Sequence, residues 1–105
     1  MKKYVVEITI SAHKDIGNIY TYLAEATDDK FYANGIIAKI YRSIEKVIVF
    51  PRSNRRIDDE LDLSTEMRRI LIQKRYVAFY QIKNNVIIIQ RIVDGRRDYK
   101  ELLGL

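Results

Sequence analysis

The chain has 105 residues, of which 48% are apolar and 31% charged, with no cysteine and a single histidine. This composition is typical of one globular domain, and it excludes disulfides, thiol chemistry, zinc–thiolate sites and sites built from several histidines. No apolar run approaches the ~20 residues of a membrane span, and the first ten residues are too short and too alternating for a signal peptide. We therefore expect a single cytoplasmic domain over residues 1–105.

The net charge of +5 is concentrated in the second half of the chain, where residues 52–105 carry twelve basic and eight acidic side chains. Five of those acids lie between Asp58 and Glu66, so the rest of the C-terminal sequence is strongly basic. Such asymmetry favours a polyanionic partner or an acidic protein. The alternative is a solvated basic face with no partner.

Residues 3–10 alternate in side-chain character and are rich in β-branched residues, which predicts a β-strand. From Ala12 to Ala26 the apolar residues recur at helical spacing, so we expect a helix with Ser11 as its N-cap. Asp15 would then lie in the first turn, where a carboxylate interacts favourably with the helix dipole.

A second helix follows after a short polar link, Thr27-Asp28-Asp29. Its apolar spacing continues over residues 31–48 until Pro51 stops it, and the two helices predict an antiparallel hairpin. Gly35 costs this helix about 1 kcal/mol relative to alanine, and we expect it to mark a close approach of the two helix axes. Four tyrosines of the hairpin are expected at the core edge or at an interface: Tyr20, Tyr22, Tyr32 and Tyr41.

Residues 51–66 are rich in turn-forming and charged residues, with three arginines ahead of an acidic run. We expect a mobile surface loop that neutralises its own charge. It connects the helices to the basic C-terminal sheet.

Three strand-like runs follow at residues 67–72, 76–82 and 86–93, and the polar residues 83–85 join the last two into a hairpin. In the first run, two alternating sets of side chains compete for the core face. One contains Ile70 and Ile72, the other Met67 and Leu71, and each carries one arginine. The order strand, helix, helix and three strands predicts an α+β fold, β-α-α-β-β-β, with the helical hairpin packed on a small, mainly antiparallel sheet.

The helix opening Ser11…Asp15-Ile16…Ile19…Tyr22-Leu23 resembles that of the RelE/ParE superfamily of bacterial toxins. Pro51 continues the resemblance, and so do the strand residues Arg69-Ile70…Tyr76-Val77-Ala78-Phe79-Tyr80-Gln81-Ile82. The ending Val86-Ile87-Ile88-Ile89…Arg91-Ile92…Gly95-Arg96-Arg97-Asp98 extends it over nearly the whole chain.

The resemblance implies the toxin of a type II toxin–antitoxin system, such as those that stabilise plasmids, neutralised in a hetero-oligomer by an acidic antitoxin. ParE-like members inhibit DNA gyrase. RelE-like members enter the ribosome and cleave mRNA without a metal. Neither route implies a cofactor. A third possibility, from a different class, is a non-toxic basic module that binds an acidic peptide.

The resemblance also implies where the site lies. Arg97 occupies a phosphate-binding position of the RelE-type toxins, and Arg68 takes the place of one of two expected lysines. The other RelE-type positions hold Val77, Ile70 and Leu103, with Tyr99 one helical turn before the last as a substitute for the tyrosine. The candidate catalytic residues are thus Arg97, Tyr99 and Arg68. The set expected to bind target or phosphate is Arg68, Arg69, Arg75, Arg91, Arg96 and Arg97.

Since arginine clamps phosphate well but carries protons poorly, the missing residues favour the ParE-like branch.

Overall fold

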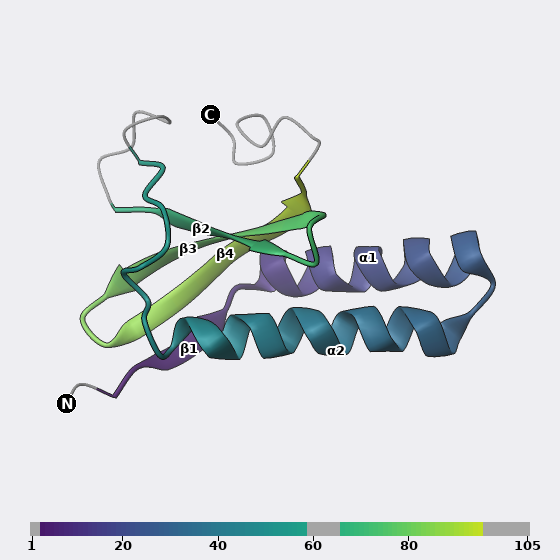
Figure 1. Ribbon diagram of the computed structural model, residues 1–105, viewed down its shortest axis with the longest axis horizontal. Helices are drawn as coiled ribbons and strands as arrows, with labels where there is room; N and C mark the ends of the chain where they lie inside the picture. The colour runs from purple at the N-terminus through teal and green to yellow at the C-terminus, as the bar shows by residue number, and fades with distance from the viewer. Residues whose placement is uncertain (1–2, 59–65, 96–105) are drawn as a thin grey trace.

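The computed structural model describes residues 3–58 and 66–95. Its elements follow the predicted order, which confirms the α+β fold (Figure 1). They are β1 (Val5–Ile8), α1 (Ile10–Thr27), α2 (Lys30–Val47), β2 (Arg68–Ile72), β3 (Tyr76–Lys83) and β4 (Val86–Asp94).

The four strands form one sheet in the order β1-β4-β3-β2. β1 runs parallel to β4, whereas β4, β3 and β2 pair antiparallel, as the mainly antiparallel prediction requires. A bulge between Phe79 and Tyr80 shifts the register of β3 against β4. The helices lie antiparallel on one face of the sheet and extend beyond it at the α1–α2 turn (Figure 1).

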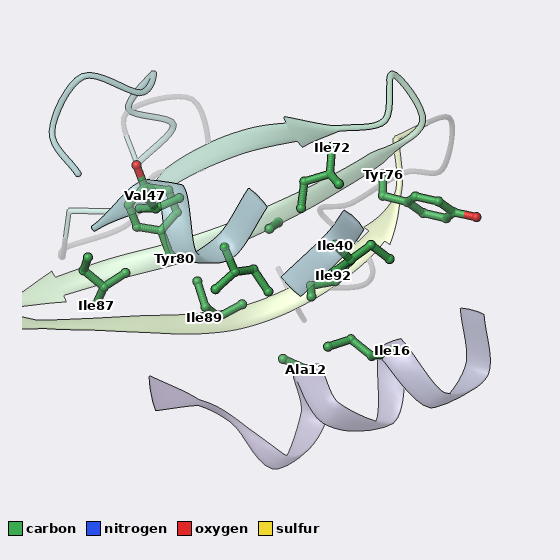
Figure 2. Close-up of a cluster of buried hydrophobic side chains, with 12 residues drawn as sticks. Ala12, Ile16, Ile40, Val47, Ile72, Tyr76, Tyr80, Ile87, Ile89 and Ile92 are labelled. Carbon is green, nitrogen blue, oxygen red and sulfur yellow. The ribbon is translucent and has the colours of Figure 1, made fainter. Parts of the chain in front are cut away.

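The main core lies between this helical hairpin and the sheet. Ile16 of α1 and Ile40 of α2 pack in one buried cluster with Tyr80, Ile87 and Ile89 (Figure 2). On β2, Ile70 and Ile72 face this core and Leu71 is 61% exposed, which decides between the two registers left open by the sequence. Burial of these aliphatic side chains is the dominant stabilising contribution to the fold.

A second, smaller buried cluster joins Ile57 to Met67 and to strand residues Val77, Phe79 and Val93. Val77 and Phe79 alternate along β3 with the residues that face the helices, so this cluster lies on the opposite face of the sheet. The prediction of a mobile surface loop over residues 51–66 is therefore wrong for residues 51–58, because Ile57 is fully buried in this cluster. The rest of the predicted loop up to residue 65 lies outside the described residues.

The start of α1 also differs from the prediction. Thr9, not Ser11, is the N-cap, and its hydroxyl accepts a hydrogen bond from the backbone N–H of Ala12 at 3.1 Å. The same hydroxyl donates to the carbonyl of Gln90 at 2.9 Å, which fixes the cap to β4. Ile10 therefore opens the helix instead of ending the strand, and Asp15 lies beyond the first turn, away from the predicted dipole interaction.

Gly35 does not mark a close approach of the helices. A methyl group built at this position meets no atom within 4 Å, and the residue is exposed. Of the four tyrosines predicted at the core edge or at an interface, Tyr20 is half-buried, whereas Tyr22, Tyr32 and Tyr41 are exposed on the hairpin. Their place at an interface stays a prediction.

Candidate functional site

The structure describes four of the predicted site residues: Arg68, Arg69, Arg75 and Arg91. Arg96, Arg97 and Tyr99 lie outside the described residues, so their roles stay predictions. The four described arginines do not converge on one point. Arg68 and Arg69 are adjacent on β2 and face opposite sides of the sheet, whereas Arg75 and Arg91 line the same cleft.

Arg68 is bound to its own chain. Its Nε donates to Glu66 Oε1 at 2.7 Å, and its Nη1 donates to the carbonyls of Arg52 and Asn54 at 2.9 and 2.6 Å. Tyr80 holds the same segment, since its hydroxyl donates to the carbonyl of Pro51 at 2.7 Å. These bonds fasten the residues after α2 to the sheet, and they commit two guanidinium nitrogens of Arg68 to that role.

Arg69 lies on the face opposite the helices. The pairing register places its backbone opposite Phe79, which in turn pairs with Arg91 next to the bulge in β3. The backbone N–H of Arg69 donates to the carbonyl of Arg55 at 3.1 Å. Part of the β2 edge is thereby covered by the chain itself.

Arg91 forms a two-pronged ion pair with Asp15 of α1. Its Nε and Nη2 donate to the two carboxylate oxygens at 2.7 and 2.9 Å. Asp15 Oδ2 also accepts the backbone N–H of Ile92 at 2.9 Å, beyond the point where β1 stops pairing with β4. The hydrogen bonds from Arg91 hold the Asp15 carboxylate where it replaces the missing strand, and they raise the pKa of Arg91 further above its ordinary value.

Arg75 precedes β3 at the same end of the sheet. Its guanidinium carbon lies 5.8 Å from the ring centre of Tyr22 and 5.5 Å from that of Tyr76, and its Nε donates to Asp94 Oδ2 at 3.3 Å. Burial raises the pKa of the Tyr76 hydroxyl above its ordinary value. Tyr76 extends past the aliphatic core with its hydroxyl pointing away from it (Figure 2).

Arg75 and Arg91 belong to a cleft of about 390 Å³ between α1 and the ends of β3 and β4. Its two arginines and two aspartates form two ion pairs, an arrangement suited to binding and orienting a ligand rather than to moving protons. Within residues 3–58 and 66–95, no three His, Asp or Glu side chains are grouped as a metal site would need. No helix in that part of the chain is both long and apolar enough to cross a membrane.

Sequence reasoning missed Asp15, Tyr22, Tyr76 and Asp94 as members of this cleft. The helical pattern contained a usable signal for Asp15, because it lies next to Ile16 and between Ala12 and Ile19, on the edge of the buried stripe. The other three had no such signal, since their meeting depends on how α1 crosses the end of the sheet.

Residues 6–99 match the family model described as the ParE toxin of the type II toxin–antitoxin system parDE. The match spans most of the chain, which therefore belongs to the ParE toxin family. A search of curated proteins finds no match. Among solved structures, the chromosomal ParDE toxin–antitoxin system from P. aeruginosa is similar, with a TM-score of 0.75, 16% identity, and coverage of 90% of this chain and 98% of that chain. At this identity the likeness supports the fold alone.

Proposed function

We propose that this chain is a growth-inhibiting toxin that acts on DNA gyrase in the cytoplasm and is neutralised by an acidic antitoxin. The observation that carries the proposal is its membership of the ParE toxin family over residues 6–99. The gyrase target comes from the ParE-like branch of the superfamily, which the sequence pattern also favours.

The contacts of Arg68 weigh against the RNA-cleaving alternative. Metal-free RNA cleavage needs cations free to hold the scissile phosphate and a base to accept the 2′-hydroxyl proton. Two nitrogens of Arg68 bind Glu66 and backbone carbonyls instead. Arg97 and Tyr99 would then have to supply the chemistry with little help from β2.

An open sheet edge supports binding of an antitoxin strand. β1 pairs with β4 on one side, and within the described residues no strand pairs with its other side. Val5 of β1 is half exposed, and exposed Val49 and Phe50 line a depression of about 290 Å³ beside Tyr4. An extended antitoxin segment would pair with β1 and place apolar side chains there, with its acidic residues facing the basic toxin.

Controlled expression tests the proposal. Induction without an antitoxin should arrest growth, and purified protein should leave gyrase in cleaved complexes with DNA. Codon-phased mRNA cuts without such complexes would support the RelE-like route instead. Normal growth at confirmed expression of folded protein would support the non-toxic binding module.

A single substitution tests whether Arg97 belongs to the target-binding site. Arg97→Ala, with Tyr99 intact, should relieve growth arrest because it removes the arginine predicted to bind the target. Arg42→Ala, an exposed change of equal charge on α2, is the control and should stay toxic. If the Arg97 variant is as toxic as the control, Arg97 does not belong to the site.

A further inference from the structure

The cleft between α1 and the end of the sheet has no part in the proposed function above, yet it combines charged and apolar side chains. Its volume of about 390 Å³ lies within the range of ligand sites. Apolar side chains, including Ile19, Ile92 and Val93, contribute to its lining beside the two arginines. A ligand group of mixed apolar and charged character would therefore fit it.

The two arginines of the cleft are held differently. Arg91 makes two hydrogen bonds of 2.7 and 2.9 Å to Asp15, and that carboxylate is tied to the backbone of β4 as well. The Nε of Arg75 donates to Asp94 at the longer distance of 3.3 Å, and the Arg75 side chain is 38% exposed. The ion pair of Arg91 therefore stabilises the fold. The ion pair between Arg75 and Asp94 is weak enough for Arg75 to bind another carboxylate instead.

Two tyrosine rings hold the guanidinium group of Arg75 in a position that suits a second carboxylate. Tyr22 and Tyr76 lie on the guanidinium group at 5.8 and 5.5 Å, close enough for cation–π attraction to restrict its position. A guanidinium with a fixed plane binds a carboxylate through two parallel N–H groups at little entropic cost. Arg75 is therefore preorganised for a two-pronged acidic partner.

We propose that this cleft binds an acidic segment of a partner protein, in which one carboxylate pairs with Arg75 beside an apolar neighbour. Asp15 and Asp94 also line the cleft, and these two carboxylates disfavour the closely spaced phosphates of a nucleic acid strand. A peptide carries isolated carboxylates and can place aliphatic groups against Ile19 and Val93. The antitoxin is the natural source of this segment, an assignment that rests on the proposed function.

Nuclear magnetic resonance titration of the full ¹⁵N-labelled chain tests the site itself. The probe is the capped peptide Ala-Leu-Glu-Leu-Ala, and the matched peptide has glutamine in place of glutamate. We expect saturable shifts of the Arg75 Nε–H and of the backbone amides of Tyr76 and Asp94 with the first peptide only. Equal shifts with the glutamine peptide, or no saturable shift, would overturn the proposal.

Two variants of equal charge separate this site from general attraction to a basic protein. R75Q should weaken peptide binding about tenfold, the loss of roughly 1.4 kcal/mol, whereas R42Q on α2 should change it less than twofold. Equal losses in both would show non-specific charge and sink the idea. Tighter binding of oligothymidylate at the same resonances would assign the cleft to nucleic acid instead.

A binding assay with the cognate antitoxin decides the source of the segment separately. If the antitoxin supplies it, purified R75Q binds the antitoxin more weakly than R42Q does, whatever the toxicity of either variant. Equal affinity of the two variants for the antitoxin would overturn this assignment. If the chain proves non-toxic, the proposed function fails while the peptide titration still decides the cleft.

Discussion

The ion pair between Asp15 and Arg91 joins α1 to β4 at the level of single residues. One carboxylate accepts two hydrogen bonds from the guanidinium and one from the backbone N–H of Ile92. The Asp15 side chain is only 11% exposed, so its partners would be left poorly solvated without it. The pair therefore matters more than an ordinary surface salt bridge.

Asp15→Asn should lower the free energy of unfolding by about 2 kcal/mol, because the amide oxygen cannot satisfy both Arg91 and the N–H of Ile92. Urea unfolding followed by circular dichroism measures the change. Asp28→Asn is the matched control at the left-handed C-cap of α1, where φ is 50° and asparagine is well tolerated. A loss of the same size in both variants would contradict the role given to Asp15.

Asp58 makes stability depend on pH. Hydrogen bonding from the Arg56 guanidinium, chiefly, lowers the pKa of Asp58 from 3.8 to about 2. Because the folded-state pKa is the lower one, this carboxylate contributes stability above pH 3.8 that is lost as the pH falls toward 2. The difference in unfolding free energy between the parent and Asp58→Asn should be constant above about pH 5 and shrink below pH 4. A difference that does not change between pH 5 and pH 2 would contradict this linkage.

Within the helices, glycines offer a direct test of packing. At both Gly17 and Gly35 an added methyl group meets nothing within 4 Å, so alanine should stabilise each helix by about 1 kcal/mol. At Gly95 the same atom would lie 3.1 Å from the carbonyl oxygen of Arg75 and from Val77 Cγ2. Gly95→Ala should therefore bring no gain or a loss of stability. Thermal unfolding of the three variants decides, and stabilisation at Gly95 would contradict the tight contact.

The turn between β2 and β3 is strained. Gln73 and Lys74 have φ values of 55° and 57°, and the N–H of Arg75 donates to the carbonyl of Ile72, as in a type I′ turn. Asn-Gly suits this geometry far better, so Q73N/K74G should raise stability by about 1 kcal/mol. Asn84→Gln, in the other hairpin at φ 55°, should have the opposite effect. Unfolding in urea measures both, and an unchanged midpoint for the double variant would argue against strain.

The elements that sequence reasoning predicted well are those whose pattern is local. Helical spacing placed both helices, and alternation on residues 67–72 limited β2 to two registers. The predicted start of α1 was wrong because the N-cap Thr9 is held by a hydrogen bond to Gln90, 81 positions away in the sequence. Ile57 was missed for the same kind of reason, since its buried contacts include Val77 and Phe79, which are distant in sequence.

The candidate site, like the fold, was predictable from the sequence only where the signal is local. Basic residues at strand ends pointed to Arg68, Arg69, Arg75 and Arg91, yet their different surroundings could not be read from the sequence. An arginine can stabilise the fold or bind a ligand, and which of the two it does depends on the acidic and aromatic residues that contact it from other elements. Asp15 and Tyr22 are such partners, and both come from α1.

For the whole molecule, the sheet order has a consequence for biosynthesis. β1 pairs in parallel with β4, so Val5 to Ile8 lie beside Val86 to Ile89. A growing chain therefore cannot complete its sheet until almost all of it has left the ribosome, and such distant pairings also slow folding. Folding of this chain is thus tied to the end of its synthesis: a chain that stops before β4 lacks the strand that pairs with both β1 and β3, and it should not form this sheet.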